Sequence, residues 1–120
     1  MKNIIAALLL FFSFNAFAES SNVAIYFSGN QLINGARLIG KTGYKTEELA
    51  YFEMFDGYVS GVFDTLSNNK IICPVGDRFI PREQVLAIAA KYLLNEPEKW
   101  NFPATILIEE SFKKTFPCKK

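Results

Sequence analysis

The sequence predicts an all-α fold, a compact bundle of four to five helices with one disulfide. Two observations predict the helices: apolar residues recur three and four positions apart in four segments, and glycine, asparagine or proline follows each segment. The third observation is a pair of cysteines, Cys73 and Cys118, in a chain of 120 residues. Two cysteines allow a single pairing, so one covalent link should close the bundle.

The first 18 residues have the pattern of a secretory signal peptide. Lys2 precedes an apolar run from residue 4 to 14, and small residues follow up to Ala18. This run is shorter than the roughly 20 apolar residues that a membrane-spanning helix needs. We therefore expect cleavage after Ala18 and a periplasmic mature chain, residues 19–120, that forms one α-helical domain without a membrane span.

Export favours a disulfide between Cys73 and Cys118, because exported chains fold in an oxidising compartment. Closing the long loop between them should stabilise the fold by roughly 4 kcal/mol on the chain-entropy model. A zinc site is a poor alternative, since two cysteines are too few ligands and the chain has no histidine. We expect neither a metal nor another cofactor.

The first helix is predicted from about Ser28 to Ile39. Ser28 is a possible N-cap, and Gly40 follows as a stop signal. The segment before it, residues 23–27, is expected to be an extended or early helical arm, because nothing downstream offers a strand partner. The predicted apolar face consists of Leu32, Ile33, Ala36 and Ile39.

The second and longest helix is predicted from about Thr46 to Leu66. Thr46 can cap it, while Glu47 and Glu48 place carboxylates at the positive end of the helix dipole. Apolar residues cover a wide part of its surface, so more than one neighbouring helix should pack on it.

Two glycines, Gly57 and Gly61, lie inside this helix. Each interior glycine costs a helix about 1 kcal/mol relative to alanine. Acidic residues along the helix exclude a membrane contact. With Ser60 the glycines form a small-residue patch, on which we expect another helix to pack at close range. That helix should come from the same chain in the first place, or else from a second copy.

Two further helices are predicted in the second half of the chain. The third begins with Pro81, continues with apolar residues at helical spacing, and stops before Pro97. A short turn, residues 98–102, then leads to Pro103 and a last helix that continues to about Thr115.

The residue types exclude several kinds of chemistry. Without histidine, Ser-His-Asp and Cys-His catalysis are impossible. Asp56 and Asp64 would lie about 12 Å apart along a helix, which is too far for a glycosidase pair. The mature chain has 12 basic and 12 acidic residues, so we expect no nucleic-acid partner. A binding protein, not an enzyme, is therefore expected.

Five stretches in this order resemble a known family: GYVSGVFD, CP with a glycine-containing loop, EQVLAIAAKYL, NEPE and FPC. Over roughly residues 28–118 the chain resembles the Rap/Tai-type immunity proteins of bacterial type VI secretion, which neutralise peptidoglycan amidase effectors. The resemblance implies a small α-helical periplasmic protein, often a homodimer, that occludes the active-site cleft of a papain-like Cys-His endopeptidase. Many members carry a further cysteine pair on the first two helices, which is absent here.

Two loops are candidates for the contact with such a toxin. Cys73 should pin residues 70–79, and two prolines should pin residues 95–102. Rigid loops are favoured because ordering a loop on binding weakens affinity. Trp100 is expected above all to cap the end of the bundle. The candidate toxin contacts are Asp77, Arg78, Phe79, Glu98, Lys99 and Trp100.

Two other functions stay open at this point. A small periplasmic acid-stress chaperone has the same size, helical class and single disulfide, and it would hold client proteins at strongly acidic pH. An inhibitor of lysozyme-like enzymes would be recognised by assaying glycosidases beside amidases.

Overall fold

The computed structural model describes residues 26–74 and 79–119. It contains α1 (Gly29–Ala36), α2 (Thr46–Asn68), α3 (Arg82–Asn95), the 3-10 turn η1 (Pro97–Lys99) and α4 (Ala104–Thr115). Within these described ranges there is no β-strand, and one isolated bridge pairs Ser28 with Pro103. The predicted all-α fold is confirmed. None of the described helices is both long and apolar enough to cross a bilayer. The predicted signal peptide lies outside the described residues.

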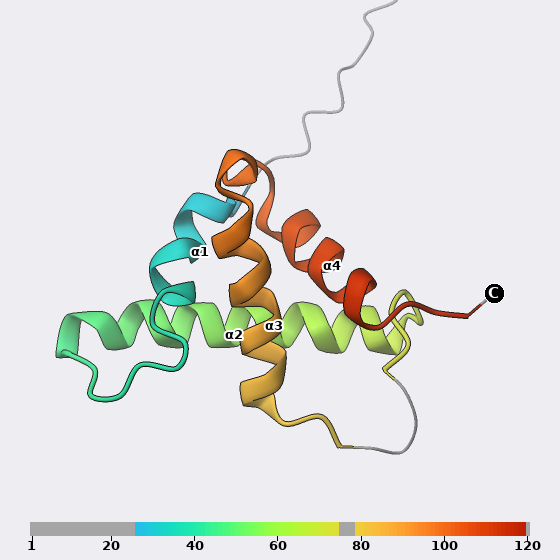
Figure 1. The fold of residues 1–120 in the computed structure, drawn as a ribbon, viewed down its shortest axis with the longest axis horizontal. Helices are drawn as coiled ribbons and strands as arrows, with labels where there is room; N and C mark the ends of the chain where they lie inside the picture. Colours follow the sequence, from blue (N-terminus) through green and yellow to red (C-terminus); the bar gives the residue numbers. More distant parts are fainter. Residues whose placement is uncertain (1–25, 75–78, 120) are drawn as a thin grey trace, which may run out of the picture.

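The long helix α2 is the base on which the other helices pack. Figure 1 shows α1 and α4 above α2, and α3 crossing α2 near its middle. Each of the three contacts α2, and α3 also contacts α1 and α4. The prediction that α2 has several neighbours is therefore confirmed.

The core fills the space between α2 and the other three helices. Phe55 and Val59 of α2 are fully buried there. Ser111 is the one buried polar side chain among the described residues, and its hydroxyl donates a hydrogen bond to the Ile108 carbonyl oxygen at 2.7 Å. The core is therefore apolar with its polar member satisfied. The other large, fully buried side chains are Phe112, Leu32, Ile72, Leu93, Leu107 and Ile108.

Several helices begin or end one to three residues away from the predicted positions. α1 ends at Ala36, earlier than predicted, because the chain turns there and reaches Gly40 with a left-handed φ of 84°. The N-cap of α2 is Lys45, one residue before the predicted Thr46. Pro81 and Pro103 likewise precede α3 and α4 as N-caps. Ser28 is the N-cap of α1, as predicted.

The close approaches between helices occur at glycines other than those predicted. A Cβ built on Gly35 would lie 2.5 Å from the Tyr51 carbonyl oxygen and closer still to Phe55, so α1 crosses α2 at this point. A Cβ on Gly57 or Gly61 would meet nothing within 4 Å. The expectation that these two glycines pack against another helix of the same chain is therefore wrong for the described residues, because α1, α3 and α4 cover other parts of α2.

Cys73 and Cys118 form the predicted disulfide, which is confirmed. The Cys73 amide also donates a hydrogen bond to the Phe116 carbonyl oxygen at 2.9 Å. The Phe63 ring lies edge-on to Phe112 and Phe116, with centroid distances of 5.1 and 5.9 Å. The C-terminal segment is thus held to the end of α2 by a covalent bond, a hydrogen bond and aromatic packing.

Candidate partner-binding surface

The two loops predicted to contact a toxin lie at opposite ends of α3. Phe79 precedes this helix, whereas the loop around η1 follows it. Figure 1 shows the η1 turn in orange at one end of α3 and the yellow segment that begins with Phe79 at the other. Fourteen helical residues separate them by about 21 Å. The structure therefore does not bring the predicted contacts together into one plug.

Trp100 caps the end of the bundle, as expected. Its indole N–H donates a hydrogen bond to the Leu93 carbonyl oxygen at 2.7 Å, and its ring packs on the core. The Arg37 guanidinium lies 5.5 Å from the ring centroid. The Trp100 carbonyl oxygen also accepts a hydrogen bond from the Asn30 amide at 2.9 Å. Trp100 is thus occupied in joining α1 to α3.

Lys99 also contacts its own chain. Its ammonium group lies 3.5 Å from a Glu110 oxygen and 3.8 Å from a Glu96 oxygen. It donates a hydrogen bond to the Tyr92 hydroxyl at 3.2 Å, and this hydroxyl donates one to Glu110. The hydrogen bond from Tyr92 holds the pKa of Glu110 below its usual value. The hydrogen bond with Tyr92 raises the pKa of Lys99. Of the candidate contacts in this loop, Glu98 is exposed, whereas Lys99 and Trp100 are half-buried.

Phe79 is the most exposed large apolar side chain of the described residues, at 89%. Its neighbour Ile80 packs against the core, and Arg82 forms an ion pair with Asp56 at 2.9 Å. The backbone beneath the ring is therefore anchored, while no described residue covers the ring itself. Phe79 also borders a hollow of about 230 Å³ beside Asp64. The other two candidates, Asp77 and Arg78, lie outside the described residues.

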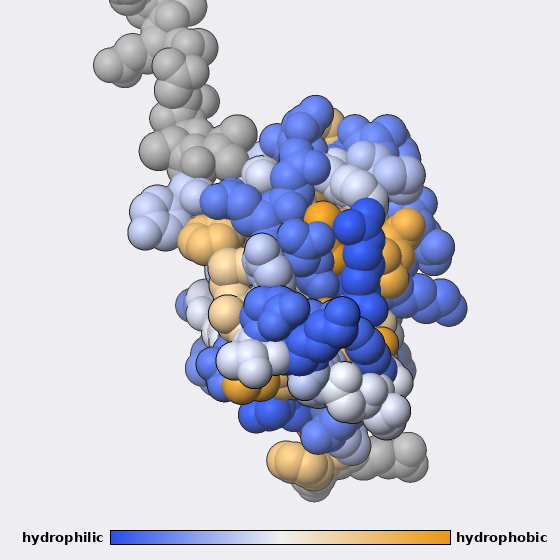
Figure 2. Space-filling model, turned by 90° about the vertical axis from the view of Figure 1, so that its left-hand side faces the viewer, coloured by the Kyte–Doolittle hydropathy of each residue, from blue (hydrophilic) through white to orange (hydrophobic). Residues whose placement is uncertain are grey.

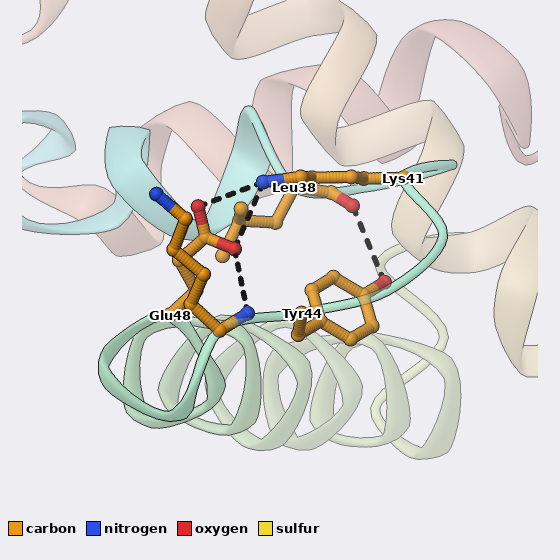
Figure 3. A network of polar contacts seen from close by, with 5 residues as sticks. Leu38, Lys41, Tyr44 and Glu48 are labelled. Atoms are coloured by element: carbon orange, nitrogen blue, oxygen red, sulfur yellow. Dashed lines mark hydrogen bonds and ion pairs between the residues drawn. The ribbon is translucent and has the colours of Figure 1, made fainter.

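A third loop, residues 37–45 between α1 and α2, was not identified from the sequence. Figure 3 shows its polar contacts. The Lys41 ammonium contacts both Glu48 oxygens at 2.7 and 2.9 Å, and the Lys45 amide donates a hydrogen bond to the same carboxylate at 3.0 Å. The Tyr44 hydroxyl donates one to the Leu38 carbonyl oxygen at 3.3 Å. The hydrogen bond from Lys41 holds the pKa of Glu48 below its usual value.

This loop is one wall of a cleft of about 410 Å³, and the first turns of α3 are the opposite wall. The sequence signal that could have found it is the pair Gly40 and Gly43, whose φ values of 84° and 73° let the chain turn twice. The cleft is lined by Ile39, Gly40, Lys41, Thr42, Tyr44, Phe52, Arg82, Glu83, Leu86 and Ala87.

A second shallow groove, of about 560 Å³, lies between α2 and α4 and contains the two glycines of α2. Gly57 and Gly61 form part of its floor, and Thr105 and Glu109 of α4 form part of its side. Figure 2, which views the molecule from the side on which α2 begins, shows small apolar areas within a mostly hydrophilic surface.

The described residues hold no candidate metal centre, since no three histidine, cysteine, aspartate or glutamate side chains gather in residues 26–74 and 79–119. The described surface has an exposed aromatic ring, an arginine ion pair and a rigid loop beside a cleft, which are features common in protein–protein contacts.

Comparison with protein families supplies the context for this surface. Residues 28–118 match the family described as Rap1a immunity proteins. This range is well over half of the chain and contains all four α-helices and both disulfide cysteines. Neither a curated protein nor a solved structure matches the chain. The protein belongs to the Rap1a immunity protein family.

Proposed function

We propose that this protein is a periplasmic immunity protein that inhibits a cognate type VI secretion amidase. The target is a papain-like Cys-His endopeptidase of peptidoglycan, and inhibition occurs by occlusion of its active-site cleft. Membership of an immunity family supports toxin binding, and the signal-peptide pattern and the disulfide support export. Occlusion requires no catalytic residue, only a rigid surface that fits the cleft.

The observation that carries the proposal is the exposed Phe79 ring on an anchored backbone. Burying such a ring in a partner contributes about 1.5 to 3 kcal/mol, and aromatic anchors beside arginine are typical of binding hot spots. The Trp100 loop is less suited to this role, because Trp100 and Lys99 already contact their own chain. We therefore place the toxin contact at the Phe79 end of α3.

Inhibition assays with Phe79→Ala test this proposal. If an amidase gene lies beside the gene of this protein, its product is the toxin to purify, and cleavage of purified peptidoglycan is the readout. We expect Phe79→Ala to weaken inhibition about 10- to 100-fold, because the anchor is lost. Phe102→Ala is the matched control, since Phe102 is also exposed but lies beyond the other end of α3. Equal inhibition by the wild type and Phe79→Ala would remove Phe79 from the contact.

Two further assays, of a lysozyme-like glycosidase and of client aggregation, separate the remaining alternatives. Inhibition of a lysozyme-like glycosidase in place of the amidase would change the target class. Suppression of client aggregation at strongly acidic pH, without inhibition of either enzyme, would favour the acid-stress chaperone.

We also propose that the protein forms a homodimer through Gly57, Ser60 and Gly61. The two glycines each cost the helix about 1 kcal/mol, and no described residue uses the space above them. A second copy approaching the groove between α2 and α4 would use this space. Because the space is open within one copy, Gly61→Leu should give a folded monomer, which sedimentation equilibrium can measure. A wild-type protein that is already monomeric, or an unchanged dimer in the variant, would exclude this seam.

A further inference from the structure

We propose that the cleft between residues 37–45 and the start of α3 receives a lysine or arginine side chain of the protein partner. The identity of that partner as the toxin rests on the proposed function. The chemistry of the cleft follows from its own residues: apolar walls, one rim carboxylate without an ion pair to a described residue, and a loop that is already rigid.

The walls of the cleft fit the alkyl stem of a long cationic side chain. Ile39, Phe52 and Leu86 line it, and the Tyr44 ring packs on Phe52 with a centroid distance of 5.0 Å. Lysine and arginine place their methylene groups against such apolar surfaces while the charge stays at the water boundary. The faces of aromatic rings also attract cations. A volume of about 410 Å³ is ample for one such side chain.

The rim of the cleft selects the sign of the charge. Lys41 is paired with Glu48 at 2.7 Å, and Arg82 is paired with Asp56 at 2.9 Å. Each of these two cations is thus already neutralised by a carboxylate of the same chain. Glu83, in contrast, is exposed at the rim and forms no ion pair with a described residue. Its carboxylate is therefore free to accept hydrogen bonds from an ammonium or guanidinium group.

The wall formed by residues 37–45 is ordered before any partner binds. Lys41 and the Lys45 amide both hold Glu48, and the Tyr44 hydroxyl holds the Leu38 carbonyl oxygen. Figure 3 shows that these contacts connect the loop to its own ends and to the first turn of α2. Binding a side chain here therefore requires no further ordering of the loop, which favours affinity.

The test is a titration of the full mature protein with two short peptides, followed by backbone amide NMR shifts. The first is a capped Gly-Lys-Gly peptide, and the second carries norleucine in place of lysine, which keeps the alkyl stem and removes the charge. We expect weak binding of the lysine peptide with shifts at Gly40, Thr42 and Ala87. The norleucine peptide, or the variant Glu83→Gln, should bind about threefold or more weakly, as expected for a lost ion pair at a water-exposed rim.

Two further variants test whether the carboxylate at the rim of the cleft binds the lysine peptide. Glu47→Gln, an exposed carboxylate of α2 that does not line the cleft, should bind the lysine peptide like the wild type. Glu83→Lys places a like charge at the rim and should abolish binding. Equal binding of both peptides, unchanged binding by Glu83→Gln, or shifts confined to other surfaces would overturn the inference. Because the toxin is absent from this titration, such a result leaves amidase inhibition untouched, whereas failure of the inhibition assay leaves the peptide result standing.

Discussion

The aromatic residues beside the two ends of α3 differ in whether their side chains contact the rest of the chain. At one end, Trp100 donates a hydrogen bond to the Leu93 carbonyl oxygen, packs on the core and lies under Arg37. At the other end, Phe79 is almost fully exposed above an anchored backbone. Both are aromatic loop residues within three positions of a proline, so sequence context alone does not distinguish them. The comparison teaches that an aromatic loop residue is informative about binding only when its contacts within the chain are known.

The largest expected effect tests this difference through stability. Trp100→Ala should lower the free energy of unfolding by about 2 to 4 kcal/mol, because it removes a half-buried ring and its hydrogen bond. Phe79→Ala should change it by less than about 0.5 kcal/mol, because the ring is exposed. Urea unfolding followed by circular dichroism measures both. Similar losses in the two variants would contradict the assignment of one end to the fold and the other to a partner.

A second comparison, of Gly35 with Gly57, tests the packing around α2 and should show a smaller effect on stability. Gly35→Ala should destabilise the fold by about 1 to 3 kcal/mol, because the new methyl group meets the Tyr51 carbonyl and Phe55. Gly57→Ala should stabilise a single copy by up to about 1 kcal/mol, because within one copy the methyl group enters open space and alanine favours the helix, although the same methyl group would occupy the proposed dimer seam. Thermal unfolding of the two variants at the same protein concentration gives the comparison. A destabilised Gly57→Ala protein would show that the open face of α2 is needed for folding.

The smallest expected effect concerns the polar contacts near the Trp100 end. The pKa of Glu110 is lowered in the folded protein by the hydrogen bond from Tyr92. Its contribution to stability is therefore fully present above the unfolded-state pKa, near pH 4, and is lost as the pH falls through the folded-state pKa. Glu110→Gln should accordingly flatten the acid side of the stability profile slightly. Glu53→Gln removes an exposed carboxylate without an ion pair to a described residue and is the matched control.

Much of the fold could be predicted from residue patterns, because helix formation depends on neighbours three and four positions away. Ser28 was identified as a cap, and the helices of the second half were placed to within a few residues. The errors lie where local signals conflict. Ile39 continues the apolar period of α1, yet the helix ends at Ala36 and the chain turns toward Gly40, whose φ is 84°.

The candidate site was less predictable. The sequence indicates both Phe79 and Trp100 as candidate toxin contacts. Their different contacts depend on which helices meet at each end of α3. The cleft beside residues 37–45 was not predicted at all, since residues of this loop, of α2 and of α3 line it together. Glu83 lies about forty residues from Tyr44 in the chain, and no local pattern relates two positions so far apart.

By itself, the sequence determined the helices, the disulfide and the exclusion of histidine chemistry, because each follows from residue type, spacing or a pairing without alternatives. The tertiary structure decided which side chains are free to meet a partner. Gly35 and Gly61 are both glycines inside a helix, but α2 packs against Gly35, whereas no described residue packs against Gly61. The physical reason is that covering depends on where helices cross, and a crossing is set by packing of the whole core, not by the residues beside the glycine.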